Sequence, residues 1–431
     1  MPRLEDVQLI IFDQDGTLVD SHELNYTAVS KVAQELGYEL PLDLHKARSL
    51  VGLPSEDYYK QLLPKELVGR WEEIREKARE WHPILLRELV RPFPHVRETL
   101  EELRERGYTL VLYTNGSRQY FEMVQKHFGF YDLFHSLHSV QDNDQTKKGL
   151  IKDLRLRYGD IPTAIVGDTR EDVESAEFNG SLSIGVRYGY DSTGIEHANF
   201  FLSSFRDLLA LFDPRRPLFT RISTMIGARK AKDQPIVVGL SGVDTSGKTH
   251  FTSDLTHFLR YSGFEVQEIR LDDFHNPRNI RYAGDDEVEN YLSRSFDLGT
   301  LTSKVLAPIR LGMLDISLTM LNLHTDTYSV TRRYHIDENT IVLLEGVFLF
   351  RQELQPYIDF KIFLHVPFDE VWERVRKRDV PLYGEGILEK YSSKYIPAQE
   401  QYLSEYPPEE VADLIINNQN YMRPEIIFEK V

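Results

Sequence analysis

Acidic, hydroxyl and basic side chains follow several short apolar runs of this 431-residue chain. The first run, residues 7–12, leads into Asp13 and Asp15, which stand two positions apart and are followed by a glycine. At the end of a strand, two carboxylates at this spacing can face one point beyond the sheet. Such a pair can bind a divalent cation, or divide into a nucleophile and an acid/base. Taken alone, the pair is more often a solvated acidic turn, so its meaning depends on the segments that follow.

A second apolar run, residues 108–113, ends in a segment suited to phosphate. Thr114 offers a hydroxyl, and Asn115 and Gly116 offer free backbone N–H groups at the start of a helical pattern. Helix starts of this kind hold phosphate oxygens.

Two further segments supply charge. Lys147 and Lys148 precede a helical pattern, and the run at residues 163–167 leads into the acidic pair Asp168 and Asp172. Phosphate-ester chemistry needs a nucleophile, a cation that neutralises charge, a fixed positive side chain and hydroxyl or amide donors. All of these groups occur in order along the first half of the chain.

A different phosphate-binding pattern follows the apolar run at residues 235–240. The segment GVDTSGKT matches the pattern GxxxxGK with a following Ser or Thr, and apolar residues on one helical face come after it. Its glycines let backbone N–H groups turn toward a β-phosphate, Lys248 can bridge the β- and γ-phosphates, and the Thr249 hydroxyl can bind Mg²⁺. We therefore expect an ATP site made by Gly242, Asp244, Ser246, Gly247, Lys248 and Thr249.

Carboxylates near this loop favour a kinase over a nucleotide hydrolase, because a kinase needs a base beside an acceptor hydroxyl. Asp272 ends a predicted strand and is well placed for that base. Glu345 ends another predicted strand and could reach Mg²⁺ through water. Arg374 and Arg378 lie on a predicted helix that could close over the transferred phosphoryl group, although a charge run is usually only a solvated face.

The alternation of short apolar runs with longer helical patterns predicts an α/β protein with two doubly wound parallel-sheet domains. The expected domains are a Rossmann-like domain at residues 1–212, a junction at 213–234 and a P-loop domain at 235–431. From about residue 20 to about residue 92 the sequence has a helical pattern, which predicts a helical insertion after the first strand. Such an insertion can act as a lid. Open α/β sheets bind ligands beyond the carboxyl ends of their strands, where the groups above are expected.

The composition restricts the protein's class. The formal net charge is −17, which disfavours nucleic acid as a partner, and the absence of cysteine excludes disulfides and thiolate chemistry. No run approaches the roughly 18 apolar residues of a membrane helix, so we expect a cytoplasmic protein without a membrane partner.

Residues 5–210 resemble the haloacid dehalogenase superfamily of phosphatases, in the phosphoglycolate phosphatase-like branch with a helical cap after the first strand. The resemblance lies in the ordered set DxDGTL, TN, Lys and GDxxxD. It implies that Asp13 attacks phosphorus and that Asp15 protonates the leaving oxygen and then activates water. It also implies that Thr114 holds a phosphoryl oxygen beside Asn115 and Gly116, and that Lys147 is preferred to Lys148 as the fixed lysine.

The same resemblance implies an Mg²⁺ site formed by Asp13, the carbonyl of Asp15, Asp168 and Asp172. The cap selects the substrate in this family, so His22, Glu23, Tyr26 and Gly52 are candidates for the cap or entrance.

The stretch from about residue 215 to the end resembles bacterial uridine kinase-like proteins. The matching segments include GVDTSGKT, LDDFHNPR, SFDLGTL and LLEGVFLF. The resemblance implies that Asp272 is the general base, that His275 and Asp297 lie on the nucleoside side, and that Arg374 and Arg378 are lid residues. One departure weakens uridine as the acceptor: Leu321 and Asn322 stand where nucleoside kinases of this group tend to carry an aromatic-Asp pair.

Together these features predict a bifunctional enzyme: an Mg²⁺-dependent phosphomonoesterase of a small phosphate ester, and an ATP-dependent kinase of a small hydroxyl acceptor such as uridine. Two alternatives are a polynucleotide end-repair enzyme and a nucleotide-sensing regulator with one inactive domain. The acidic charge and the cap argue against the first, and the competent residue at every named catalytic position argues against the second.

Overall fold

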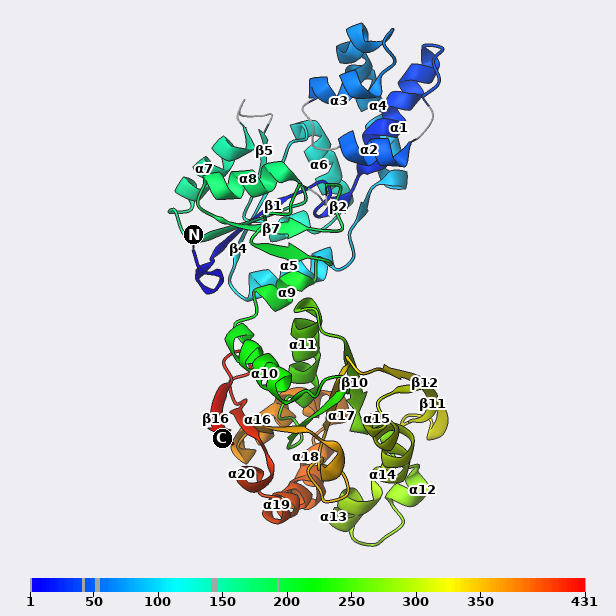
Figure 1. The fold of residues 1–431 in the computed structure, drawn as a ribbon, viewed down its shortest axis with the longest axis vertical. Helices are drawn as coiled ribbons and strands as arrows, with labels where there is room; N and C mark the ends of the chain where they lie inside the picture. The colour runs from blue at the N-terminus through cyan, green and yellow to red at the C-terminus, as the bar shows by residue number, and fades with distance from the viewer. Residues whose placement is uncertain (1, 41–42, 51–54, 141–145, 192–193, 431) are drawn as a thin grey trace. The chain divides into compact units, whose positions relative to one another are not determined.

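A computed structural model describes residues 2–40, 43–50, 55–140, 146–191 and 194–430. The chain forms two compact units, residues 1–212 and 213–431 (Figure 1). Each unit is built on a largely parallel sheet with helices, which confirms the predicted fold class. Within the described ranges, no helix is long and apolar enough to cross a membrane.

The sheet of the first unit has six parallel strands in the order β5-β4-β1-β6-β7-β8. All five residues of β1 are buried, as expected for a central strand covered on both faces. The strands are β1 (Leu9–Asp13), β4 (Thr109–Thr114), β5 (Ser136–Ser139), β6 (Thr163–Gly167), β7 (Leu182–Val186) and β8 (Phe200–Leu202). The helices of this core are α5 (Val96–Glu105), α6 (Arg118–His127), α7 (Lys147–Arg157), α8 (Arg170–Phe178) and α9 (Asp207–Leu211).

The cap lies at one end of this unit, and its described residues form helices α1 to α4 (Figure 1). The cap enters through β2 (Val19–Asp20) and leaves through β3 (Arg91–Pro92), which pair antiparallel and form a two-stranded stem. Its helices are α1 (His22–Glu35), α2 (Leu44–Leu50), α3 (Ser55–Leu62) and α4 (Trp71–Leu89). Helix α4 buries Ile74, Ala78, Leu85 and Leu86, an apolar stripe at helical spacing that packs the cap together.

The sheet of the second unit has the order β10-β13-β9-β14-β15-β16, with only the edge strand β16 antiparallel. Alternate residues of β9 enter two cores: Val238 packs with helices α10 (Arg216–Arg229) and α11 (Lys248–Tyr261) on one face, and Val237 packs on the other. The strands are β9 (Ile236–Gly242), β10 (Val266–Arg270), β13 (Ile341–Gly346), β14 (Phe360–His365), β15 (Leu414–Asn417) and β16 (Glu425–Glu429).

The longer helices of this unit are α10 (Arg216–Arg229), α11 (Lys248–Tyr261), α16 (Phe368–Arg378) and α19 (Ile396–Glu405). Helix α10 occupies most of the stretch expected to be a junction, and its Phe219, Ile222 and Ile226 are buried in the core of the second unit. An antiparallel hairpin of β11 (Leu314–Asn322) and β12 (Thr327–Ile336) stands apart from the main sheet. The short helices are α12 (Arg278–Arg281), α13 (Glu287–Glu289), α14 (Leu298–Thr300), α15 (Ala307–Arg310), α17 (Val380–Tyr383), α18 (Gly386–Lys390) and α20 (Pro408–Val411).

Candidate active sites

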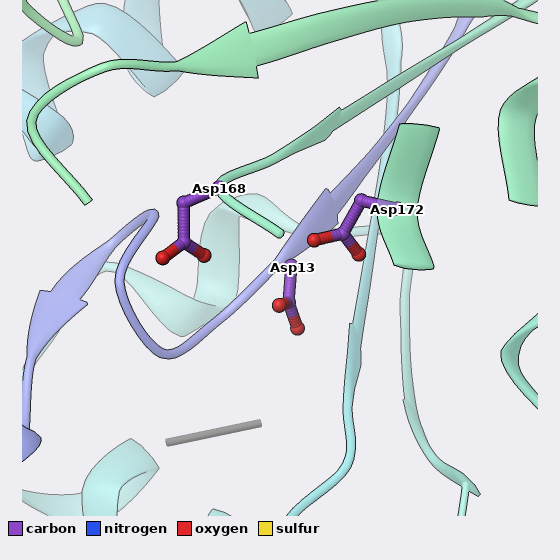
Figure 2. Close-up of side chains that lie close together, drawn as sticks. All are labelled: Asp13, Asp168 and Asp172. Carbon is purple, nitrogen blue, oxygen red and sulfur yellow. The ribbon is translucent and has the colours of Figure 1, made fainter. Parts of the chain in front are cut away.

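Three carboxylates meet at the carboxyl edge of the first sheet (Figure 2). Asp13 ends β1, Asp168 follows β6, and Asp172 lies in the first turn of α8. One carboxylate oxygen from each lies within 4.8 Å of the others, and all three side chains are buried. The parallel register of β1 and β6 brings the two strand ends together, although Asp13 and Asp168 are 155 positions apart in the sequence.

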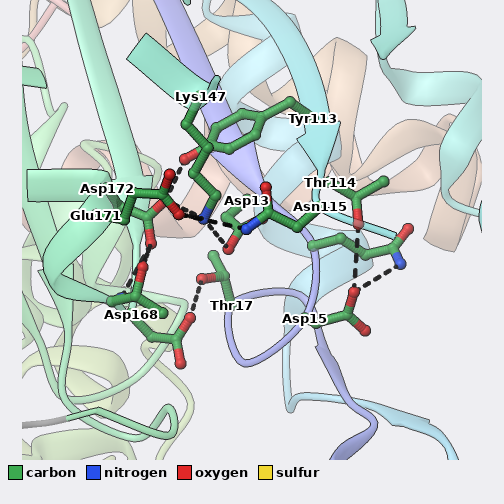
Figure 3. A network of polar contacts seen from close by, with 12 residues as sticks. Asp13, Asp15, Thr17, Tyr113, Thr114, Asn115, Lys147, Asp168, Glu171 and Asp172 are labelled. Carbon is green, nitrogen blue, oxygen red and sulfur yellow. Dashed lines mark hydrogen bonds and ion pairs between the residues drawn. The ribbon is translucent and has the colours of Figure 1, made fainter. Parts of the chain in front are cut away.

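Lys147 is buried against this cluster (Figure 3). Its Nζ lies 3.3 Å from Asp13 Oδ2 and 2.9 Å from Asp172 Oδ1. The side chain of Thr146 accepts a hydrogen bond from the Gly149 N–H and so caps helix α7, whose first residue is Lys147. Lys148 instead lies outside the cluster, where its Nζ is 3.2 Å from Glu174 Oε2.

The electrostatics of the cluster suit a divalent cation. Burial, with the neighbouring carboxylates, raises the pKa of Asp13 well above its usual value and that of Asp168 to about 7. Burial alone would lower the pKa of Lys147, but Asp13 and Asp172 hold it above its usual value. One ammonium therefore faces three close carboxylates, and oxygen donors of this kind are the ligands that Mg²⁺ prefers. The residues present fit such an ion.

Each carboxylate of the cluster is oriented by its neighbours. Thr169 donates to Asp172 Oδ2 from its N–H at 3.0 Å and from its hydroxyl at 2.6 Å, and the Tyr113 hydroxyl donates to Asp172 Oδ1. The Tyr190 N–H donates to Asp168 Oδ2 at 2.7 Å.

The turn after Asp13 requires glycine. Gly16 has a φ of +81°, and a Cβ there would lie 2.2 Å from Asp168 Oδ2.

Asp15 points away from the three clustered carboxylates and is held by hydroxyl groups. The Tyr120 and Ser21 hydroxyls each lie 2.5 Å from Asp15 Oδ1, and Thr114 Oγ1 lies 3.4 Å from Oδ2. Burial raises the pKa of Asp15, and these hydrogen bonds act in the opposite direction. A carboxyl group with a raised pKa is suited to proton transfer at neutral pH.

The phosphate segment predicted after β4 lies beside Asp15. The Gly116 N–H donates to Thr114 Oγ1 at 2.9 Å, and Asn115 Nδ2 lies 3.4 Å from Glu171 Oε2. The structure therefore brings together all the predicted residues of this site. It also adds Tyr120 and Ser21, for which the sequence carried no signal beyond their nearness to the named segments.

A cavity of about 190 Å³ opens between Asp13, Asp15 and the cap. Of the cap candidates, His22 lines it and Glu23 and Tyr26 do not, whereas Gly52 lies outside the described residues. The described lining residues are Asp13, Asp15, Ser21, His22, Leu24, Asn25, Leu50, Tyr58, Tyr59, Arg75, Arg79, His82, Asn115, Gly116, Ser117, Tyr120 and Thr169.

In the second unit, the loop between β9 and α11 has the predicted phosphate-binding sequence. Gly247 has a φ of +89°, and Lys248 is the first residue of α11. Lys248 Nζ is buried and donates to the carbonyls of Gly242 at 3.0 Å and Val243 at 2.8 Å. Burial lowers the pKa of Lys248, although the nearby carboxylates of Asp244, Glu345 and Asp272 act in the opposite direction. The ammonium group thus lies at the centre of the loop.

Two other loop residues have distinct surroundings. The carboxylate of Asp244 is partly buried and accepts hydrogen bonds from Tyr291 at 2.9 Å and Gln399 at 2.7 Å. The Ser246 hydroxyl is buried without a hydrogen-bond partner among the described residues, and its carbonyl accepts from Asn418 Nδ2 at 2.7 Å. Hydrogen bonds from Tyr291, Gln399 and Asn418, which lie outside the loop, therefore hold the loop in place.

Two carboxylates face the loop. Thr249 Oγ1 donates to Glu345 Oε1 at 3.1 Å, because the parallel pairing of β13 with β9 brings Glu345 beside the start of α11. Burial raises the pKa of Glu345, and Lys248 lowers it while Asp272 raises it, so these charges are close together. Asp272 is exposed just after β10.

Other predicted residues of the second unit make structural contacts. Arg374 donates to the carbonyls of Thr245 at 3.0 Å and Asn418 at 2.7 Å, and Arg378 pairs with Asp379. His275 Nδ1 lies 2.7 Å from the Asp272 carbonyl. Asp297 accepts from the Thr300 N–H and caps α14.

Both units match known families. The sequence model of the haloacid dehalogenase-like hydrolases matches residues 10–186, and that of the phosphoribulokinase / uridine kinase family matches residues 237–422. The first part of the chain belongs to the haloacid dehalogenase-like hydrolases, and the second part matches the phosphoribulokinase / uridine kinase family, so the chain is a fusion of a phosphatase domain and a kinase domain.

Curated relatives resemble the first unit. A phosphoglycolate phosphatase of Aliivibrio fischeri is 30% identical over 202 residues, which cover 43% of this chain and 87% of the relative. A phosphoglycolate phosphatase of Vibrio parahaemolyticus is 26% identical over 221 residues, which cover 48% of this chain and 96% of the relative. A 5'-nucleotidase of Pseudomonas aeruginosa is 30% identical over 187 residues, 42% and 84%.

Solved structures resemble each part. A possible uridine kinase from Bacillus stearothermophilus is 26% identical, covering 46% of this chain and 97% of its own, with a TM-score of 0.39. A haloacid dehalogenase-like hydrolase from Streptococcus pneumoniae is 22% identical, covering 48% and 99%, with a TM-score of 0.43.

Proposed function

We propose that the first unit hydrolyses phosphate monoesters in two steps through an aspartyl-phosphate. An oxygen of Asp13 attacks phosphorus, the ester P–O bond breaks, and Asp15 gives its proton to the leaving oxygen. Water then attacks the acyl phosphate while Asp15 takes up a proton, releasing phosphate and free Asp13. The observation that carries this proposal is the separation of the two carboxylates: Asp13 lies in the charged cluster, and Asp15 is held apart by hydroxyl groups.

In this proposal Asp13, Asp168, Asp172 and the Asp15 carbonyl hold Mg²⁺, which when bound neutralises phosphate charge and favours ionised Asp13. Lys147 adds a fixed positive charge at Asp13, 3.3 Å from its Oδ2. Thr114 and Asn115 hold phosphoryl oxygens, and the Gly116 N–H, which donates to Thr114 Oγ1 at 2.9 Å, orients that hydroxyl beside the substrate.

We further propose that the second unit transfers the γ-phosphoryl group of ATP to a small hydroxyl acceptor, a nucleoside such as uridine. Asp272 takes the proton of the acceptor hydroxyl as that oxygen attacks phosphorus and the bond to ADP breaks. Lys248 holds the phosphates with Gly242, Ser246 and Gly247. Thr249 and Glu345 hold the Mg²⁺ of the nucleotide, and their contact at 3.1 Å supports this assignment.

Other roles in the kinase proposal follow the family resemblance. Asp244 contributes to the nucleotide site through its place in the loop, and Arg374 and Arg378 act on the phosphates after closure. His275 and Asp297 contribute to the acceptor side. We propose that the two units, residues 1–212 and 213–431, act as separate catalytic domains with different substrates, because a shared substrate pair would hydrolyse ATP without net product.

Two variants of the full chain test this assignment. Asp13→Asn should abolish hydrolysis of a phosphate-ester panel and leave phosphoryl transfer from ATP to a nucleoside panel intact. Lys248→Ala should do the reverse, with a loss on the order of 10²-fold or more. Loss of both activities from either substitution, in a folded protein, would refute two independent sites.

A further inference from the structure

The cavity of the first unit has two chemically different walls. The core contributes the reacting groups Asp13 and Asp15, which are the only carboxylates among the described lining residues. The cap contributes apolar side chains such as Leu24 and also Arg75 and Arg79. The cap wall, which lies across the cavity from the reacting groups, is therefore positively charged.

Helix α4 presents these two arginines together. Arg75 and Arg79 stand four residues apart, so they lie on the same face of the helix, one turn from each other. Their side chains are 29% and 31% exposed, so both are largely covered by the cap. They are thus positioned by the helix rather than extended into solvent.

The two guanidinium groups share a single acid within the described part of the chain. Glu76 Oε1 lies 3.2 Å from Arg75 and 2.9 Å from Arg79. The Glu76 side chain is 57% exposed and does not line the cavity, and ion pairs at such sites contribute only about 0–1 kcal/mol. Two positive charges against one exposed carboxylate leave guanidinium donors for a ligand.

His82 continues the same face of α4 but adds no charge. Burial, reinforced by Arg79, lowers the pKa of His82 to about 4, so the ring is neutral near pH 7. Its Nε2 lies 3.2 Å from Asn25 Oδ1. The positive charge of this wall therefore comes from Arg75 and Arg79.

We propose that Arg75 and Arg79 bind a second anionic group, a carboxylate or a phosphate, on the leaving group of the phosphatase substrate. The proposal rests on the phosphatase function proposed for this unit. Guanidinium groups match the oxygens of carboxylates and phosphates through paired hydrogen bonds. The cavity volume of about 190 Å³ is below the roughly 300–1,000 Å³ of pockets for drug-sized ligands, which favours a short leaving group.

Matched substrates test the proposal with the full-length protein and Mg²⁺. 2-Phosphoglycolate and 2-hydroxyethyl phosphate differ only in a carboxylate against a hydroxymethyl group, and ethylene glycol bisphosphate adds the phosphate arm. We expect kcat/KM to favour at least one of the anionic substrates over 2-hydroxyethyl phosphate by roughly 10- to 100-fold, the range expected for charge-assisted hydrogen bonds. The anionic substrate with the higher kcat/KM shows whether the site prefers a carboxylate or a phosphate.

An Arg75→Met, Arg79→Met double variant should lose this preference and retain hydrolysis of p-nitrophenyl phosphate, whose leaving group carries no second anion at the site. Lys77→Met is the matched control, because Lys77 lies on the same helix, pairs with Glu73 at 3.3 Å and does not line the cavity. That variant should keep the wild-type preference.

The comparison of the three esters with the wild-type protein tests the anion site even if the double variant fails to fold. Hydrolysis of p-nitrophenyl phosphate with equal kcat/KM for all three esters would overturn the anion site and leave the phosphatase function standing. No hydrolysis of any ester by the folded protein would overturn the proposed function and this inference with it.

Discussion

Replacing Lys147 by methionine tests the reasoning about the buried cluster most directly. Methionine keeps an unbranched side chain of similar length and removes the ammonium group. The side chain of Lys147 is 1% exposed, and its Nζ lies 3.3 Å from Asp13 and 2.9 Å from Asp172. The substitution leaves these carboxylates buried without their positive partner.

The size of the effect follows from these distances. Each contact at about 3 Å is worth on the order of 5 kcal/mol at an effective dielectric constant of about 20, before the cost of burying the charges. Removing one partner of a buried ion pair typically costs about 3–5 kcal/mol. We expect Lys147→Met to lower the free energy of unfolding of the first unit by that amount without Mg²⁺, and to lower kcat for ester hydrolysis by roughly 10²–10³-fold with Mg²⁺.

Lys148→Met is the matched control from the adjacent position. Lys148 is 39% exposed and pairs with Glu174 at 3.2 Å, so its removal should change stability by less than about 0.5 kcal/mol and leave kcat near the wild-type value. Urea unfolding followed by circular dichroism and hydrolysis of p-nitrophenyl phosphate measure the two effects. The reasoning is refuted if Lys147→Met is as stable and as active as the wild type, or if Lys148→Met loses more activity.

Three further outcomes are expected. The His82 pKa falls from 6.5 to about 4 on folding, so as the pH is lowered the unfolded chain takes up a proton before the folded chain does. The free energy of unfolding should therefore decrease by about 2 kcal/mol between pH 7 and pH 5. Urea unfolding of His82→Gln should lack that part of the decrease. Asp272→Asn should lower phosphoryl transfer by about 10²-fold or more, whereas Asp273→Asn, which only breaks the pair with Arg332 at 2.9 Å, should retain it; equal losses would contradict Asp272 as the base. Chelation of divalent cations should abolish both activities, and added Mg²⁺ should restore them and raise the melting temperature; ester hydrolysis that persists in chelator would argue against the metal site.

The strands that carry the proposed catalytic side chains could be predicted because each is a continuous apolar run. The runs that end at Asp13, Thr114 and Glu345 form β1, β4 and β13, since central parallel strands are buried on both faces. Strands at or near the sheet edges escaped prediction: β5 and β8 are short, and β5 is partly exposed, so neither has a pattern distinct from a loop.

Side-chain partners were less predictable than motifs. Arg374 was expected on the phosphates, yet its guanidinium contacts the carbonyls of Thr245 and Asn418 in the structure. Nothing in the spacing of Arg374 distinguishes a carbonyl partner from a phosphate, because either satisfies its donors.

The sequence by itself determined the two phosphate-binding constellations and the order of the elements that carry them, because both depend on local spacing and on the ends of apolar runs. Only the tertiary structure decided between Lys147 and Lys148, gave Asp15 its hydroxyl partners Tyr120 and Ser21, and turned Arg75 toward the cavity. These choices depend on which side chains the fold buries beside each other, such as Asp13 and Lys147, which are 134 positions apart, and local periodicity carries no record of that.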